Sequence, residues 1–168
     1  MNVALGGTFD PVHDGHLALF ERAFELGDVT VGLTSDELAP RTRHVDRYVR
    51  PFEERKRDLV EELEPFAAEH DREFEIRTLT EPTGIATEPG FDVLIVSPET
   101  KDGGARINEI REERDLPPLD IEVVDHVPAE DGQRISSTRI VRGEIDRHGN
   151  RTPEREGREA TRPDADDA

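Results

Sequence analysis

The glycine loop, residues 6–16, reads Gly-Gly-Thr-Phe-Asp-Pro-Val-His-Asp-Gly-His and carries the residue types that bind phosphate. It follows a short apolar stretch and precedes a segment with helical spacing of its apolar residues. Paired glycines let backbone approach a phosphate closely, and Thr8 adds a hydroxyl. Gly15 would let the N-terminus of the following helix face the same anion. We therefore interpret the glycine loop as a phosphate-binding segment.

Two histidines, His13 and His16, stand three residues apart at the start of that helix, so both can face one ligand. An imidazole can donate to a phosphate oxygen as negative charge accumulates there in a transition state. Two alternatives stay open: a glycine turn whose histidines only cap the helix, and a metal pair completed by Asp10 or Asp14. The dinucleotide fingerprint and the Walker A lysine are absent, which excludes ordinary dehydrogenases and P-loop enzymes.

A second motif, residues 135–142, reads Ile-Ser-Ser-Thr-Arg-Ile-Val-Arg. Its hydroxyls, from Ser136, Ser137 and Thr138, fall at a predicted helix start, and Arg139 follows them directly. Exposed amides, hydroxyls and a guanidinium suit the outer phosphates of a nucleotide. A plain N-cap gives the same pattern, so this motif alone leaves the choice open.

Two more loops carry polar residues after predicted strands. Ser97-Pro98-Glu99-Thr100 follows the most apolar strand, and Glu99 could accept hydrogen bonds from a base, a ribose or neighbouring backbone. A helix-capping loop with a solvated glutamate is the alternative. Arg41 and Arg43 could place a cation over reacting phosphates, or form a solvated surface pair.

The elements that must position these loops alternate between strand and helix patterns. We predict strands at 2–5, 29–33, 73–77, 91–96 and 120–124, and helices at 15–26, 51–70, 105–114 and from Ser136. This order predicts the α/β class: a single doubly wound, Rossmann-like domain with a five-stranded parallel sheet flanked by helices. Ligands of such sheets bind at the carboxyl ends of the strands, where all the polar loops described above would meet.

The composition limits the class of protein. A chain of 168 residues with 33% hydrophobic content suits one domain, residues 1–149, and we predict a charged, disordered tail at 150–168. A net charge of −18 disfavours nucleic acid and anionic membranes as partners. No apolar run approaches the roughly 20 residues that cross a bilayer, and there is no cysteine for a disulfide or a thiolate metal site. We hypothesise that the acidity reflects a high-salt environment, that is, a halophilic source.

Together, Gly-Gly-Thr-Phe-Asp-x-x-His-x-Gly-His and Ile-Ser-Ser-Thr resemble the nucleotidyltransferase superfamily, which shares His-x-Gly-His with class I aminoacyl-tRNA synthetases. Ser-Pro-Glu-Thr, Ile107-Asn108-x-x-Arg111 and the segment 32–36 are similar to the archaeal and eukaryotic phosphopantetheine adenylyltransferases. The likeness covers about residues 3–149. It implies an enzyme that uses ATP with Mg²⁺ and 4′-phosphopantetheine to form dephospho-coenzyme A and pyrophosphate in coenzyme A biosynthesis.

The resemblance also implies roles for individual residues. Thr8, His13 and His16 would be catalytic: Thr8 would hold the acceptor phosphate and the ATP α-phosphate, and His16 would stabilise charge on the α-phosphate. ATP would be bound by Gly6, Gly7, Phe9, Gly15, Ser136, Ser137, Thr138 and Arg139. The acceptor would be bound by Thr8, Arg41, Arg43, Ser97, Glu99, Arg106 and Arg111. No metal site of the protein's own is expected, and a cytoplasmic monomer is expected by analogy with the family.

Two departures from the family pattern remain open. Many relatives have a lysine in the second loop, where this chain offers Arg41 or Arg43. Val141 stands where the superfamily places an arginine, so Arg139 or Arg142 would have to substitute. Rival functions are another adenylyl or cytidylyl transferase, acting for example on nicotinamide mononucleotide, and a non-catalytic nucleotide-binding module.

Overall fold

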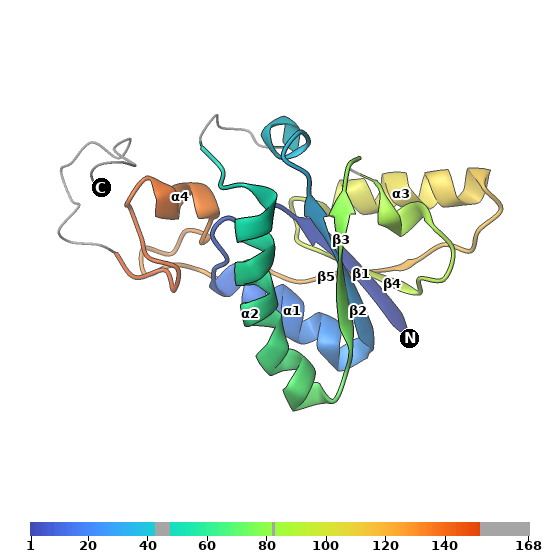
Figure 1. Cartoon of the computed structure of the whole chain (residues 1–168), viewed down its shortest axis with the longest axis horizontal. Helices are drawn as coiled ribbons and strands as arrows, with labels where there is room; N and C mark the ends of the chain where they lie inside the picture. Colours follow the sequence, from blue (N-terminus) through green and yellow to red (C-terminus); the bar gives the residue numbers. More distant parts are fainter. Residues whose placement is uncertain (43–47, 82, 152–168) are drawn as a thin grey trace.

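A computed structural model describes residues 1–42, 48–81 and 83–151, without the side chains of residues 41 and 42. Within this part a five-stranded parallel sheet has the order β3-β2-β1-β4-β5 (Figure 1). The strands are β1 (Asn2–Gly7), β2 (Asp28–Thr34), β3 (Phe74–Leu79), β4 (Val93–Val96) and β5 (Asp120–Val123). The predicted fold class is confirmed. Because β1 lies between β2 and β4, the chain reverses its direction of winding at the carboxyl end of β1.

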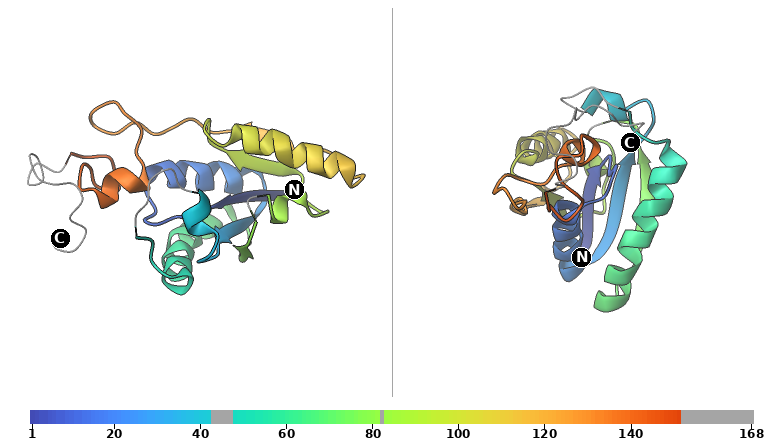
Figure 2. Two further views of the ribbon diagram at one scale, coloured as in Figure 1. Left: turned by 90° about the horizontal axis from the view of Figure 1, so that it is seen from above. Right: turned by 90° about the vertical axis from the view of Figure 1, so that its left-hand side faces the viewer.

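Helices cover both faces of the sheet. Helices α1 (Asp14–Leu26) and α2 (Phe52–His70) pack on one face, and α3 (Lys101–Glu113) packs on the other together with the short 3₁₀ turn η2 (Ile85–Thr87). Figure 2 shows α2 and α3 on opposite sides of the sheet. No helix among the described residues is long and apolar enough to cross a membrane.

The two faces follow from the side-chain alternation of the strands. Val3 and Leu5 of β1 join the core under α1 and α2, whereas Ala4 between them joins the core under α3. On the first face, Phe20 and Phe24 of α1 are fully buried, as the predicted apolar stripe requires. Burial of one such large side chain stabilises the fold by roughly 1.5–3 kcal/mol.

Most predicted boundaries agree with the structure to within two residues, and α3 is the exception. It begins at Lys101, four residues before the predicted start at Ala105, so it includes Gly103 and Gly104. Gly104 lies against the sheet, where an added Cβ would stand 3.1 Å from Ile121 Cδ1. Gly104 therefore permits a close approach of the helix to the sheet.

The segment after β5 forms a small cluster of its own at one end of the sheet. Helix α4 (Ser137–Val141) leads into a turn, and Ala129, Ile135 and Ile145 form the buried apolar contacts. Figure 1 places α4 beside the starts of α1 and α2. Two residues of the predicted tail still contact the domain, since the Arg151 amide donates to Glu130 Oε1 at 2.9 Å and Asn150 binds Asp146. Residues 152–168 lie outside the described part.

Candidate active site

The glycine loop leaves β1 and turns sharply at Phe9. Phe9 is buried and has a φ of 51°, a left-handed conformation that phenylalanine rarely adopts. Its ring lies under Gly7, where an added Cβ would come within 3.0 Å of Phe9 Cζ. The glycine is required here because a buried ring occupies the space of a side chain.

His13 and His16 cap the start of α1. The Gly15 amide donates to His13 Nδ1 at 3.1 Å, and the His13 amide donates to His16 Nδ1 at 3.2 Å. The rings stack with centroids 3.8 Å apart, and Phe9 contacts His16 edge-on. An added Cβ on Gly15 would stand 2.9 Å from His13 Cε1, so the glycine leaves room for the capping ring. The three-residue spacing is that of a capping box.

The capping bonds define the protonation of both imidazoles. Each Nδ1 accepts an N–H, so the proton of each neutral ring is assigned to Nε2. Burial lowers the pKa of His13 to about 4, opposed by Asp14 and supported by Arg134 and Arg147. Burial, with His13 nearby, lowers the pKa of His16 well below its ordinary value. Near neutral pH the site therefore offers two Nε2–H donors that carry no charge.

The metal alternative has no support in this geometry. Asp10 is buried and accepts from Arg50 Nε at 2.6 Å, and Asp14 pairs with His148 at 2.9 Å. Among the described residues no group of three or more His, Cys, Asp or Glu side chains is placed to hold a metal ion. Both histidines do cap the helix, and the capping bonds use only Nδ1.

A cavity of about 600 Å³ opens on the α3 face of the sheet, beside the first residues of the glycine loop. This volume is typical of sites for small molecules. Its walls are mostly apolar, and its polar groups include Thr8, Thr34, Glu99, Thr100 and Arg106. Gly6 and Gly7 form part of the floor, and Gly103 and Gly104 of α3 form part of one wall.

The Ile-Ser-Ser-Thr motif lies against the glycine loop. Ser137 Oγ donates to the Pro11 carbonyl at 2.8 Å, which joins α4 to the loop. Ser136 Oγ accepts from the Arg139 amide at 3.2 Å and so caps α4, as the alternative interpretation expected. The hydroxyls of Ser136 and Ser137 thus already make contacts that hold the motif in place.

Arg139 and Arg134 differ in how they are held. The Arg139 guanidinium is bound by Asp131 and Glu144; burial opposes its charge, but these hydrogen bonds outweigh burial and raise the pKa of Arg139. Arg134 is half exposed, pairs with Glu99 at 2.7 Å and lies close enough to affect His13. Arg134 was not singled out from the sequence. Its ion pair with Glu99 connects the segment before α4 to a residue that lines the cavity.

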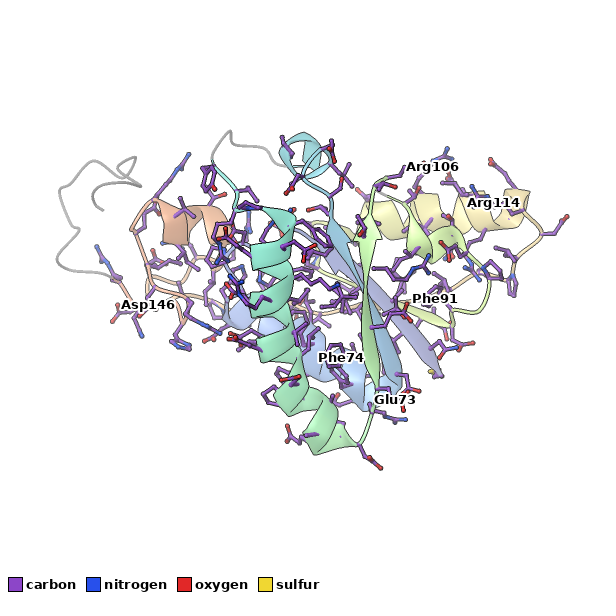
Figure 3. The ribbon with its side chains drawn as sticks, in the orientation of Figure 1. Glu73, Phe74, Phe91, Arg106, Arg114 and Asp146 are labelled. Carbon is purple, nitrogen blue, oxygen red and sulfur yellow. The ribbon has the colours of Figure 1, made fainter. Side chains whose placement is uncertain are left out.

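Only some of the residues predicted to bind the acceptor line the cavity. Arg106 and Glu99 line the cavity, and Figure 3 shows Arg106 on α3, with Arg114 toward the far end of the helix. Arg111 is not brought to the cavity: it is buried and donates to three carbonyls, of Ala86, Glu88 and Pro117. That prediction is corrected, because the guanidinium holds η2 and the end of α3 together.

Three further residues were predicted to bind the acceptor: Ser97, Arg41 and Arg43. Ser97 lies outside the cavity lining, with its Oγ 3.2 Å from Thr100 Oγ1. Arg41 belongs to the 3₁₀ turn η1 (Ala39–Thr42), but its side chain is not described, and Arg43 lies outside the described residues. The choice between these arginines therefore remains a prediction.

Arg55 is a site residue that the sequence did not point to, and Thr34, which lies in the quoted segment 32–36, was given no role there. Arg55 is completely buried on α2 and reaches both the Thr8 carbonyl and the Thr34 hydroxyl, at 3.2 and 3.3 Å. A signal was present, because Arg55 falls on the predicted apolar stripe of the helix, between Phe52 and Leu59. A charged residue on a buried stripe needs polar partners from another element.

Comparison of the sequence with known proteins identifies the family of the chain. Residues 4–143 match the cytidylyltransferase-like family. The phosphopantetheine adenylyltransferase of Methanosarcina acetivorans is 46% identical over 150 residues, covering 88% of this chain and 93% of that protein. That of Methanosarcina barkeri is 48% identical over 150 residues, covering 88% and 90%.

A solved structure gives the same result for the fold. It is a protein of unknown function from Archaeoglobus fulgidus, 35% identical with a TM-score of 0.64, and the match covers 81% of this chain and 100% of that one. The family match spans the glycine loop, the cavity and the Ile-Ser-Ser-Thr motif. The chain therefore belongs to the cytidylyltransferase-like family and, within it, to the archaeal phosphopantetheine adenylyltransferases.

Proposed function

We propose that the chain transfers the adenylyl group of ATP to 4′-phosphopantetheine, giving dephospho-coenzyme A and pyrophosphate. The observation that carries the proposal is the position of the Thr8 hydroxyl, which lies where the glycine loop meets a largely apolar cavity. An acceptor with a phosphate at one end and a long, weakly polar arm suits such a site. The curated relatives named above carry this activity in their names.

In this reaction an oxygen of the acceptor phosphate attacks the α-phosphorus of ATP. The bond from that phosphorus to the β-bridging oxygen breaks, and pyrophosphate leaves with the electron pair. Thr8 would hold the acceptor and α-phosphates, while the Nε2–H groups of His13 and His16 would donate to oxygens that gain charge. Protein groups act by positioning and charge stabilisation, with no covalent enzyme intermediate.

The outer phosphates need cations close to the glycine loop. The charges of Arg134 and Arg147 both lower the pKa of His13, and Arg134 pairs with Glu99, a residue that lines the cavity. We propose that Arg134, with Ser136 and Thr138, binds the β- and γ-phosphates. Arg139, which Asp131 and Glu144 hold in place, is a second candidate for the same phosphates.

Magnesium enters this scheme with the nucleotide. Mg²⁺ typically keeps several water ligands and binds through substrate phosphates with one or two carboxylates. The donor set of the described residues suits an ion carried by ATP rather than a dedicated protein cage. We further propose a cytoplasmic monomer as the working form and high salt as its working environment, the latter because of the net charge of −18.

The test is a panel of acceptors. The protein is incubated in molar KCl with MgATP or MgCTP and with 4′-phosphopantetheine, nicotinamide mononucleotide, riboflavin phosphate or glycerol phosphate, and pyrophosphate release is measured. We expect release only with ATP and 4′-phosphopantetheine. Turnover with a different acceptor would overturn the substrate, and binding of ATP without turnover on any acceptor would favour a non-catalytic module.

A further inference from the structure

We propose that Thr34 and Arg55 are positioning residues that aim the hydroxyl proton of Thr8 at the substrate phosphate. The inference rests on the proposed function, because it takes Thr8 as a phosphate ligand. It goes beyond that function by assigning a role to Thr34 of β2 and Arg55 of α2. None of the described side-chain hydrogen bonds of these two residues reaches the histidines or the Ile-Ser-Ser-Thr motif.

Three side chains form a line from the protein interior to the cavity. Arg55 is fully buried, and its Nη1 lies 3.3 Å from Thr34 Oγ1. Thr34 Oγ1 lies 2.9 Å from Thr8 Oγ1, and both threonines line the cavity. Thr34 itself is only 2% exposed, so its hydroxyl has little access to water.

The direction of the hydrogen bonds follows from the chemistry of these groups. A guanidinium has donors only, so Thr34 must accept from Arg55. Thr34 then still has a hydroxyl proton, and the only acceptor that the described residues provide for it is Thr8 Oγ1. A buried hydroxyl proton without an acceptor costs free energy. Thr34 therefore donates to Thr8, and Thr8 keeps its own proton for another partner.

That partner can only come from the cavity side. Thr8 Oγ1 accepts from Thr34 and is otherwise open to the cavity, since no further hydrogen bond involves this hydroxyl within the described part of the chain. A phosphate oxygen is an acceptor without a proton to offer at neutral pH. A Thr8 hydroxyl that is already oriented as a donor avoids reorganisation when the phosphate binds.

Arg55 is fixed firmly enough to define this line. Its Nε donates to the Arg50 carbonyl at 2.7 Å, its Nη2 to Asp36 at 3.1 Å, and its Nη1 also to the Thr8 carbonyl at 3.2 Å. The same guanidinium thus holds the Thr8 backbone and orients the Thr8 hydroxyl through Thr34. It also places a positive charge behind the residue that would meet a phosphate.

The first test removes the hydroxyl and keeps the shape. Thr34→Val should lower kcat/KM for 4′-phosphopantetheine about tenfold or more, as expected for one hydrogen bond to a charged ligand. Thr34→Ser should restore most of the loss. Thr87→Val is the matched control: Thr87 is buried, accepts from Arg114 and donates to the Gly84 carbonyl, but does not line the cavity. Thr87→Val should lower stability without a comparable loss of kcat/KM.

The second test asks whether the two residues act through Thr8. In a Thr8→Val background, Thr34→Val should cause little further loss of kcat/KM, because the hydroxyl that it orients is gone. Arg55→Lys keeps the charge but loses the fork; because Arg55 also holds the Thr8 carbonyl, only part of its loss should depend on the Thr8 hydroxyl. Losses that simply add to that of Thr8→Val, or a Thr34→Ser variant as impaired as Thr34→Val, would overturn the proposal.

Binding measurements separate this proposal from the proposed function. If the wild-type chain shows no turnover, the function fails, and the same variants are compared by calorimetric titration with 4′-phosphopantetheine and with ATP. Weaker binding in Thr34→Val that disappears in the Thr8→Val background supports the positioning role. Equal binding by all variants, or no binding of either phosphate ligand by the wild type, overturns it.

Discussion

Each of the two histidines has one nitrogen in the helix cap and one outside it. Nδ1 of His13 and of His16 accepts a backbone amide and shapes the start of α1, which leaves Nε2–H as an uncharged donor. Helix capping and the proposed phosphate contact would therefore involve different atoms of the same ring. Because the tasks involve different atoms, they can be separated by substitution.

His16→Gln tests the catalytic nitrogen. Glutamine at this position of a capping box can still accept the His13 amide, so the fold should be retained. The glutamine amide still has N–H donors, but they do not occupy the position of the imidazole Nε2–H, so kcat should fall about 10²-fold, with the KM for ATP little changed because the contact strengthens in the transition state. His16→Ala should lose both kcat and stability. An unchanged kcat in His16→Gln, measured by pyrophosphate release, would remove His16 from the chemistry.

The depressed pKa of His13 predicts acid sensitivity. The unfolded chain protonates this residue near pH 6.5, but the folded chain does so only near a pKa of about 4, so the stabilisation is complete above pH 6.5 and is lost as the pH falls toward 4. The difference corresponds to about 3 kcal/mol. The measurement is the free energy of unfolding from pH 7 to 4 in wild type and in His13→Asn, which keeps a capping side chain.

Acidic groups also titrate in this range and need a control. Hydrogen bonds to Arg77 and Arg139 lower the pKa values of Glu88 and Asp131, and both carboxylates are present in the two proteins. Their contribution therefore cancels in the difference between wild type and His13→Asn. Parallel pH profiles for the two proteins would contradict a buried neutral His13.

At the scale of elements, two glycines near helix starts have different surroundings although they lie in similar sequences. Gly15 lies in the first turn of α1 under the His13 ring, whereas Gly103 lies in the first turn of α3 with open space where a Cβ would be. The two positions look alike in sequence, and only packing distinguishes them.

This difference gives a paired prediction. Gly103→Ala should stabilise the protein by about 0.4–1 kcal/mol, because it restricts the unfolded chain at a helical position. Gly15→Ala should destabilise it, because the new Cβ would displace the capping ring of His13. Thermal or denaturant unfolding of both variants is the measurement. A stabilised Gly15→Ala variant would show that the ring is free to move away.

The elements themselves could largely be predicted from the sequence. Alternating apolar segments and helical stripes gave five strands and the main helices, because burial on two faces leaves a strong periodic signal. The start of α3 was placed too late, after Gly103 and Gly104, although Gly104 lies inside the helix and packs closely against Ile121. Arg111 was assigned to ligand binding, but its partners are the nearby Pro117 carbonyl and two carbonyls more than 20 residues away, those of Ala86 and Glu88.

Contacts between elements explain what the sequence could not show at the site. The glycine loop and the Ile-Ser-Ser-Thr motif were recognisable because each is a continuous segment. Thr34 and Arg55 become site residues only when β2 and α2 are packed beside Thr8. Such partners have no local signature apart from a charge on an otherwise buried stripe.

At the scale of the whole molecule, a net charge of −18 should make stability depend on salt. Self-repulsion opposes the compact state, and in molar salt the screening length falls to about 3 Å. We predict that the free energy of unfolding rises steeply from low to molar KCl, as followed by denaturant titration at each concentration. A flat profile would contradict adaptation of the chain to high salt.

The central claim is direct adenylyl transfer from ATP to one acceptor, and the reverse reaction tests this claim most directly. Labelled pyrophosphate is supplied with Mg²⁺ and dephospho-coenzyme A in molar KCl, and label is measured in ATP. We predict that labelled ATP forms with dephospho-coenzyme A, and that exchange of label into added ATP is absent when dephospho-coenzyme A is left out. Exchange with ATP alone, or no labelled ATP in the presence of dephospho-coenzyme A, would contradict the account.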